Sequence, residues 1–254
     1  MQAFSDNVTI VGIIPARGGS KGIENKNLLE IFGDTLVNRT VGCFRESRII
    51  HHIVVSSDSE EILSSLDDDI VAVRRPDNLS GDNAPIELCF EHAVTQLNEQ
   101  NIYPHILVWM QPNLPIRASG IVDEVVRGLL SRKDATSSVT CMQVDPRFRW
   151  YKKINEKQFL EPLFHGNQSF RRQDHDPAFL IDGSVVAFYV DNLSEQTGGI
   201  HNYLGENIVP IVQKQLIYSL ELDEPEDLRI LYQYLNTDVL SDAQLLDYFK
   251  ITKH

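Results

Sequence analysis

A short glycine-rich segment carries the residues best suited to chemistry in this sequence. Residues 14–22 read Ile-Pro-Ala-Arg-Gly-Gly-Ser-Lys-Gly and follow directly on an apolar run. Glycines let the main chain approach an anion closely with several backbone N–H groups, and Arg17, Lys21 and Lys26 add positive charge. These three cations outnumber the one acid between them, Glu24. The segment therefore predicts a site for phosphate groups.

The spacing separates this segment from two common phosphate-binding motifs. Lys21 lies between Ser20 and Gly22 rather than before Ser or Thr, which excludes the Walker A pattern, and the dinucleotide fingerprint G-x-G-x-x-G is absent. Ser20 also lacks the G-x-S-x-G setting of a serine nucleophile, so acyl transfer is not expected. The alternative from composition alone is a solvated glycine-rich turn with ordinary surface charges.

Apolar periodicity predicts the elements that must hold this loop. Short β-branched and apolar runs predict buried strands, and amphipathic spacing predicts helices that alternate with them. The expected strands are 8–14, 52–56, 70–73, 106–110 and 137–143, and the expected helices are 34–45, with Asp34 as N-cap, 57–66, 85–99 and 119–130. This alternation predicts a mainly parallel, doubly wound α/β sheet with its ligands at the carboxyl ends of the strands.

The alternation ends after residue 143. Residues 145–178 are rich in charge, aromatic residues and proline and lack helical periodicity, so we expect a β-hairpin arm that covers a partner surface. Further strands are expected at 184–190, 208–212 and 218–222, and helices at 225–234 and 241–249. We therefore expect one domain over residues 1–254, with the arm inserted in it.

Composition restricts the class of partner. The formal net charge is −13, from 23 basic and 36 acidic residues, which argues against binding to nucleic acid or to anionic membranes. Cys43, Cys89 and Cys141 match neither a metal-binding nor a disulfide pattern and are expected to be free thiols. We expect neither a secretory signal nor a membrane span. These features predict a cytoplasmic protein.

Several ordered segments resemble one enzyme family. The run Ile-Ile-Pro-Ala-Arg-Gly-Gly-Ser-Lys-Gly at 13–22 is similar to the nucleotide-binding signature of acylneuraminate cytidylyltransferases, the CMP-sialic acid synthetases, which include CMP-legionaminic and CMP-pseudaminic acid synthetases. Segments that follow in the family's order are 54–58, Arg75-Pro76 with Leu79 and Asp82, 111–117, Arg172-Gln173, Asp182-Gly183 and Glu221-Leu222-Asp223. The resemblance extends over residues 9–235.

The resemblance implies a Rossmann-like sheet of the A-type nucleotidyltransferases and a homodimer formed through the 145–178 arm. It implies that CTP and a 2-keto sugar acid are the substrates, and that Arg17 and Lys21 are catalytic and hold the CTP phosphates. The implied nucleotide-binding residues are Ala16, Arg17, Gly18, Gly19, Ser20, Lys21, Lys26, Asn27, Arg75 and Asp82. The implied sugar-binding residues are Gln111, Arg172, Gln173, Asp182 and Gly183, and the Arg172 guanidinium would clamp the sugar carboxylate.

The implied reaction is attack by the anomeric 2-hydroxyl of the acid on the α-phosphorus of CTP, with pyrophosphate leaving. Mg²⁺ is the implied cofactor, held by Glu221 and Asp223. We expect both carboxylates on the last sheet strand, where they alternate with Ser219 on one face and can point at one ion. The family usually has Asp at the first position, so Glu221 adds one methylene of reach. The alternative is an acidic helix start favoured by the helix dipole.

Asp182 departs from the family pattern, which commonly has Asn before the glycine at position 183. A carboxylate beside the sugar would favour an amino or hydroxyl group, so a legionaminic, pseudaminic or related acid is a candidate acceptor beside N-acetylneuraminic acid. Two other interpretations stay open. One is an enzyme of the same fold that uses GTP or another ulosonic acid, such as the deoxyoctulosonate class. The other is a nucleotide-binding protein without turnover.

Overall fold

A mainly parallel sheet forms the centre of the protein. The computed structural model describes residues 8–20, 22–81, 84–164, 171, 176–194 and 201–236, and in these residues seven strands pair in the order β11-β7-β10-β6-β1-β4-β5. They are β1 (Ile10–Pro15), β4 (His52–Ser57), β5 (Val71–Arg74), β6 (Ile106–Trp109), β7 (Ser137–Val144), β10 (Ala178–Tyr189) and β11 (Ile208–Val212). β10 runs antiparallel to β6 and β7, and the other pairings are parallel. The predicted α/β fold is confirmed.

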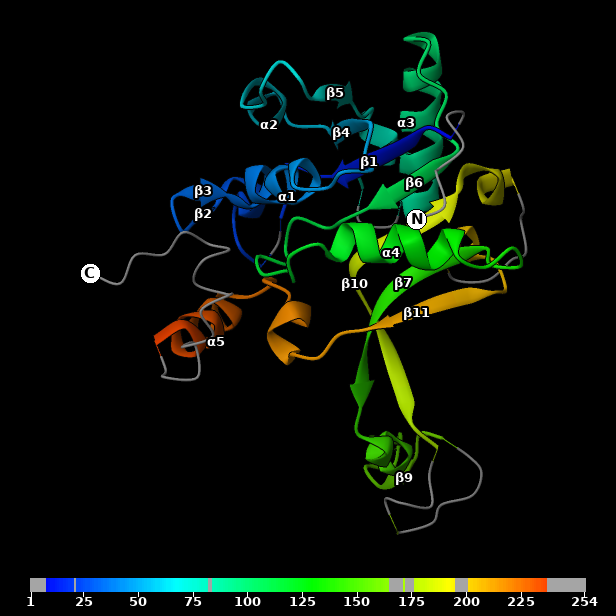
Figure 1. Ribbon diagram of the computed structural model, residues 1–254. Helices are drawn as coiled ribbons and strands as arrows, with labels where there is room; N and C mark the ends of the chain where they lie inside the picture. The colour runs from blue at the N-terminus through cyan, green and yellow to red at the C-terminus, as the bar shows by residue number, and fades with distance from the viewer. Residues whose placement is uncertain are drawn as a thin grey trace.

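Helices cover both faces of this sheet (Figure 1). They are α1 (Leu36–Arg45), α2 (Glu60–Ser64), α3 (Ile86–Glu99) and α4 (Ile121–Leu130). One buried core packs α1, α2 and α4 against residues such as Ile14 and Val108. A second core, on the opposite face, packs Phe90 and Leu97 of α3 against Val11 and Trp109. Burial of both sheet faces explains why the strands are nearly continuous apolar runs.

The start of α1 differs from the prediction. Thr35 rather than Asp34 is the N-cap, because its hydroxyl accepts a hydrogen bond from the backbone N–H of Asn38 at 3.2 Å. Asp34 lies in a small hairpin of β2 (Glu30–Ile31) and β3 (Asp34–Thr35), which periodicity did not predict because its strands are too short to show a pattern. The hairpin leads the chain directly from the glycine-rich loop into α1.

A hairpin projects from the body of the protein, as the prediction for 145–178 required. β7 and β10 extend beyond the sheet and carry the short 3-10 helix η3 (Pro146–Trp150) and the two strands β8 (Lys152–Ile154) and β9 (Leu160–Pro162) (Figure 1). β10 begins at Ala178 rather than at residue 184, and its register with β7 shifts between Ile181 and Val186. Residues 165–170 and 172–175 of the arm lie outside the described residues.

The expected strand at 218–222 is wrong. Its first part is a 3-10 helix, η7 (Leu216–Ser219), and a loop follows that leads into α5 (Pro225–Asn236). β11 is the edge strand of the sheet, but in the described residues this segment does not pair with it. The N–H groups of Tyr218 and Leu220 bond locally, and that of Leu222 bonds to Asn113 O. Leu222 and Leu231 pack in a third core with Ile217. The helix expected at 241–249 lies outside the described residues.

Short 3-10 helices complete the chain. They are η1 (Lys26–Leu28), η2 (Asp77–Leu79), η5 (Val190–Ser194) and η6 (Asn202–Leu204). Cys43, Cys89 and Cys141 are free thiols, as predicted. In the described part of the chain, no helix has the length and apolar character needed to span a membrane.

Candidate active site

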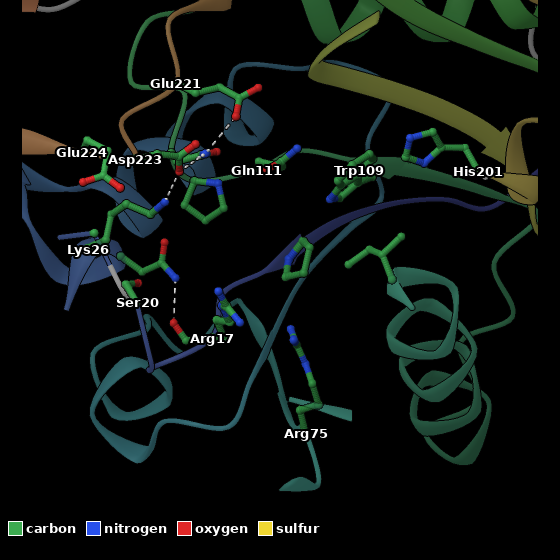
Figure 2. Close-up of a pocket in the computed structure, with 16 residues that line it drawn as sticks. Arg17, Ser20, Lys26, Arg75, Trp109, Gln111, His201, Glu221, Asp223 and Glu224 are labelled. Carbon is green, nitrogen blue, oxygen red and sulfur yellow. Dashed lines mark hydrogen bonds and ion pairs between the residues drawn. The ribbon is translucent and has the colours of Figure 1, made fainter. Parts of the chain in front are cut away.

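A cleft of about 540 Å³ opens where β1, β5 and β6 end. This is the carboxyl edge of the sheet, where doubly wound folds bind their ligands. Charged side chains from the glycine-rich loop and from the 220–224 loop face each other across it (Figure 2). The lining residues are Pro15, Arg17, Ser20, Gly22, Lys26, Asn27, Arg75, Ile86, Trp109, Gln111, Pro112, Asn113, His201, Glu221, Asp223 and Glu224.

The glycine-rich loop is fastened to its surroundings at three points. The Ala16 N–H donates to Ser56 O at 2.9 Å, and the Gly18 N–H donates to Asp58 Oδ1 at 2.8 Å. The Asn27 side-chain amide donates to Arg17 O at 2.8 Å. Because the loop is held from β4 and from its own C-terminal side, Arg17 is presented to the cleft from a fixed backbone.

The acidic 220–224 loop is held from the opposite side. The Leu222 side chain is fully buried and its N–H donates to Asn113 O at 2.8 Å, so Glu221 and Asp223 flank an anchored residue. Asp227 Oδ2 accepts hydrogen bonds from the N–H groups of Asp223 and Glu224, at 2.9 and 2.7 Å. The two carboxylates are therefore presented from a loop, which corrects the expectation of a strand face.

Gly22 brings the two loops into direct contact. A Cβ atom added to Gly22 would overlap the backbone carbonyl oxygen of Asp223 and lie 2.9 Å from Glu224 Oε1. A side chain at position 22 would thus push the loops apart. Position 22 requires glycine because of this close approach, in addition to any contact with an anion.

Opposite charges meet where the loops converge. Lys26 Nζ lies 2.6 Å from Asp223 Oδ1, and Asn113 Nδ2 donates to Asp223 Oδ1 at 3.1 Å and to Glu221 Oε2 at 3.5 Å (Figure 2). Burial and the neighbouring Asp223 carboxylate raise the pKa of Glu221. Burial by itself would raise the pKa of Asp223, but hydrogen bonds from Lys26 and Asn113 outweigh it and hold that pKa below its ordinary value.

This donor set fits Mg²⁺ bound together with a nucleotide. Mg²⁺ is commonly held by one or two carboxylates, with water and substrate phosphates as the remaining ligands. Glu221 and Asp223 supply two carboxylates, and Asn113 Oδ1 beside them is buried without a hydrogen-bond partner among the described residues. In the described ranges no group of three or more His, Cys, Asp or Glu side chains could hold a metal ion. A dedicated all-protein metal cage is therefore not what these residues form.

Arg75 provides a buried cation at another side of the cleft. Its side chain is 5% exposed, and its guanidinium donates to Ser56 Oγ at 3.2 Å and to Ser56 O at 2.6 Å. No carboxylate in the described part of the chain pairs with it. A buried charge without a counter-ion is costly. Arg75 is therefore held ready for an acceptor group or an anion.

Gln111 and Trp109 come from the end of β6. Trp109 is the last residue of the strand, and the Gln111 side chain lies against Gly183, because a Cβ at Gly183 would be 2.9 Å from Gln111 Nε2. The buried Arg117 side chain fixes this stretch by donating to Leu114 O, to Gln111 O and to Ser184 O. The strand end is thus tied to β10.

Comparison with known proteins identifies the fold family. Residues 11–145, more than half of the chain, match the family described as cytidylyltransferases. The chain belongs to this cytidylyltransferase family.

Individual relatives agree with the family. The chain is 28% identical over 178 residues to an N-acylneuraminate cytidylyltransferase of Streptococcus agalactiae, a match that covers 68% of the chain and 41% of the relative. It is 22% identical over 228 residues to a CMP-N,N'-diacetyllegionaminic acid synthase of Legionella pneumophila, covering 86% of the chain and 92% of the relative. The chain thus matches less than half the length of some relatives and nearly the full length of another.

A solved structure shows the same fold. A CMP:2-keto-3-deoxy-manno-octonic acid synthetase complexed with CTP superposes with a TM-score of 0.63 at 16% sequence identity, covering 89% of this chain and 98% of that one. At this identity the likeness supports the fold of the cytidylyltransferase.

The cleft of this cytidylyltransferase is lined by eight of the seventeen expected site residues. Those that line it are Arg17, Ser20, Lys26, Asn27, Arg75, Gln111, Glu221 and Asp223. Ala16, Gly18, Gly19 and Gly183 belong to the supporting backbone and do not line it. Lys21, Asp82, Arg172 and Gln173 lie outside the described residues.

Asp182 has a different place from the one expected. It is 5% exposed, and its carboxylate accepts hydrogen bonds from Thr140 Oγ1 (2.5 Å), Ser184 N (3.0 Å), Gln213 Nε2 (2.7 Å) and Ser219 Oγ (2.8 Å). The register shift in β10 turns this carboxylate toward β7 and the segment before the acidic loop. Four donors within the protein already engage this carboxylate and it does not line the cleft, so its contact with the sugar stays a prediction.

Several lining residues were missed by sequence reasoning. Trp109 and Ile86 were assigned only to elements, because apolar residues at a strand end or a helix start look the same whether or not they line a cleft. Asn113 lay inside a quoted motif without a role. His201 and Glu224 come from loops whose positions depend on tertiary contacts, so no local pattern could have placed them in the cleft.

Proposed function

We propose that this cytidylyltransferase transfers CMP from CTP to the anomeric 2-hydroxyl of a sialic acid-like nonulosonic acid and releases pyrophosphate. One observation carries the proposal. Arg17 of the glycine-rich loop, Lys26 of η1 and the acids of the 220–224 loop line one cleft, and Lys26 Nζ lies 2.6 Å from Asp223 Oδ1. The printed names of the relatives, an N-acylneuraminate cytidylyltransferase and a diacetyllegionaminic acid synthase, support the acceptor class.

The residues of the cleft divide the work of this reaction. Arg17 and Lys26, with backbone N–H groups of the glycine-rich loop, would bind the triphosphate and stabilise the charge that develops on pyrophosphate as it leaves. Arg75 would read the base edge. Gln111 would orient the sugar acid so that its 2-hydroxyl oxygen forms the new bond to the α-phosphorus as the bond to the β-phosphate oxygen breaks. The hydroxyl proton passes to a solvent water molecule in this step.

We propose Mg²⁺ as the cofactor, with Glu221 and Asp223 as its protein ligands. When bound, Mg²⁺ would neutralise phosphate charge and lower the pKa of the attacking hydroxyl. Lys26 would then leave Asp223 and pair with a phosphate oxygen, because Mg²⁺ would compete with its ammonium group for the Asp223 carboxylate. The chain's own contribution is to hold both carboxylates through Leu222 and Asn113.

We also propose that the enzyme is a homodimer formed through the arm. Large apolar side chains on β8, β9, the turn between them and the outer part of β10 are 41–72% exposed, namely Ile154, Phe159, Leu160, Phe179, Leu180 and Ile181. An apolar surface of this kind on a projecting hairpin favours a protein partner. Light scattering of the wild type and of Leu160→Asp tests this, and two monomeric proteins would contradict it.

A pyrophosphate-release assay tests the activity. Purified protein is incubated with CTP or GTP, with or without Mg²⁺, and with N-acetylneuraminic, diacetyllegionaminic, pseudaminic or deoxyoctulosonic acid. We expect release with CTP, Mg²⁺ and at least one nonulosonic acid, a severe loss in Arg17→Ala, and loss of the metal-dependent activity in Asp223→Ala. Release with GTP or deoxyoctulosonic acid alone would reassign the substrates, and no release with any acid would leave a nucleotide-binding protein.

A further inference from the structure

Ser56 is a buried polar residue that contacts the cleft only through its neighbours. It lies in β4, is fully buried and is not among the residues that line the cleft. Its hydroxyl and its backbone carbonyl both accept hydrogen bonds from the guanidinium of Arg75, which does line the cleft (Figure 2). The same carbonyl also accepts from the Ala16 N–H at 2.9 Å. Ser56 thus connects β4 to the residues that follow β1 and β5.

The two bonds from Arg75 to Ser56 leave one end of the guanidinium for a ligand. A guanidinium carries five N–H donors in a fixed plane. Ser56 Oγ takes the N–H of Nε at 3.2 Å, and Ser56 O takes one N–H of Nη2 at 2.6 Å. In the described part of the chain no group accepts from Nη1 of Arg75. Because Ser56 holds one edge of the plane at two points, it determines the direction in which the Nη1 and Nη2 end points.

Cys89 of α3 supports the Ser56 hydroxyl. Its Sγ donates to Ser56 Oγ at 3.4 Å, so this oxygen accepts from a thiol and from a guanidinium together. Burial raises the pKa of the Cys89 thiol and outweighs the opposite effect of the Arg75 charge, so the thiol keeps the hydrogen that it donates. A thiol is a weak donor, and its contribution should be smaller than that of Ser56. With both of its acceptor positions engaged, the Ser56 oxygen is fixed in place.

The direction of the free guanidinium end matters because it can distinguish two pyrimidines. Two parallel N–H groups match two adjacent acceptors, and cytosine presents such a pair in its O2 and N3 atoms. In uracil N3 carries a hydrogen, so one N–H of Arg75 would face another donor. A site built to pair with one hydrogen-bonding pattern rejects an analogue that leaves its polar groups unpaired. This discrimination depends on a fixed guanidinium plane, since a guanidinium that rotates freely could meet O2 alone in either base.

We propose that Ser56, supported by Cys89, is a positioning residue for Arg75 and through it sets the preference for cytosine over uracil nucleotides. The inference rests on the proposed function, in which Arg75 reads the base edge. Ser56 touches no substrate and acts only by holding the Arg75 plane. Its carbonyl also holds Ala16 at the start of the glycine-rich loop, so the group that reads the base and the loop that binds the phosphates are both anchored to this one residue.

Calorimetric titration of the full chain with CTP and with UTP, in Mg²⁺ and without an acceptor acid, tests this role. Ser56→Ala removes the hydroxyl and keeps the backbone carbonyl, so the Kd for CTP should rise about three- to tenfold, the effect of one hydrogen bond, and the Kd for UTP should rise less. Ser56→Cys keeps the side-chain volume but offers only a weak acceptor, and it should show the same loss of preference if the alanine variant does not fold. The control is Ser138→Ala, at a fully buried serine of β7 whose hydroxyl has no hydrogen-bond partner in the described residues, and it should bind both nucleotides as the wild type does.

A double-variant cycle separates positioning from a merely structural role. Arg75→Met removes the guanidinium and keeps most of the aliphatic stem, so it should abolish the preference for CTP, and adding Ser56→Ala to it should change neither Kd further. If the wild type prefers CTP and the cycle is non-additive but no acid gives pyrophosphate release, the proposed function fails and the positioning role stands. The inference is overturned if the wild type binds CTP and UTP equally or does not bind CTP. Equal increases of both Kd values in Ser56→Ala, an unchanged ratio, or additive effects in the double variant would also overturn it.

Discussion

Gly22→Ala is the substitution that most directly tests how the cleft is assembled. The added Cβ would overlap the Asp223 carbonyl oxygen and lie 2.9 Å from Glu224 Oε1. The Asp223 N–H donates a hydrogen bond to Asp227 Oδ2, which restricts movement of this backbone, so one of the two loops must shift by about 1 Å. A misplacement of this size can lower a rate by about 100-fold. We expect the kcat/KM for pyrophosphate release to fall by about that factor, or about 2.7 kcal/mol of transition-state stabilisation.

The assay compares Gly22→Ala with Gly42→Ala. Gly42 lies in α1, and a Cβ there would meet no atom within 4 Å, so this variant carries the same chemical change without the clash. Gly42→Ala should keep wild-type kinetics, whereas Gly22→Ala should lose activity and require more Mg²⁺ for half-maximal rate. Both should keep the thermal midpoint of the wild type within a few degrees. Wild-type kinetics in Gly22→Ala would refute the reasoning, because the contact between the loops would then be dispensable.

Three further substitutions probe separate parts of the site. Arg75→Lys keeps the charge but loses the planar guanidinium held by Ser56, so the KM for CTP should rise about tenfold in steady-state assays. An unchanged KM for CTP would show that Arg75 is not part of the nucleotide site. Gly183→Ala, at a φ of 67° and against Gln111 Nε2, should raise the KM for the acid and leave that for CTP unchanged, and an equal change in both would contradict this. Asp182→Ala leaves four donors without an acceptor, so urea denaturation should show a free energy of unfolding lower by about 3 kcal/mol. Asp182→Asn should lower it less, and an equal decrease in both variants would argue against the network.

The central fold could be predicted because its strands are buried on both faces. Continuous apolar runs such as 10–15 and 106–109 have few alternatives to a parallel strand, and the amphipathic helices between the strands follow with boundaries within a few residues. The glycine-rich loop could be placed as well, since its position after the first strand determines which edge of the sheet it occupies. Six of the eight expected residues that line the cleft follow β1, β5 or β6 and were placed for this reason.

The acidic loop could not be predicted in the same way. The sequence Tyr-Ser-Leu-Glu-Leu-Asp alternates as a strand does, yet the structure has a 3-10 helix and a loop there. The alternation is real, because Leu222 is buried between two presented carboxylates, but the partner of Leu222 is the third core and the bond to Asn113, not a neighbouring strand. Whether an alternating segment joins a sheet depends on its tertiary contacts, which local periodicity does not contain.

Asp182 shows the same limit for a single side chain. Its position in a motif suggested contact with the sugar, but the direction of a side chain beside a register shift depends on which strand it meets. The carboxylate is buried, is not among the residues that line the cleft, and accepts a hydrogen bond from Ser219, two residues before Glu221. It therefore supports the segment that presents the acids.

The balance of charge in the cleft explains how an acidic protein can take a polyanionic nucleotide. Among the described lining residues, three cations (Arg17, Lys26 and Arg75) are equal in number to three acids (Glu221, Asp223 and Glu224). These described residues therefore supply no net positive charge to attract a triphosphate. Lys26 is also held by Asp223 at 2.6 Å, so part of its charge is already engaged. A divalent cation on Glu221 and Asp223 would cancel their charge and release Lys26 for phosphate, so nucleotide and metal should each strengthen the binding of the other. The net charge of −13 then favours selectivity, because anions that arrive without a metal meet a neutral cleft in a negatively charged protein.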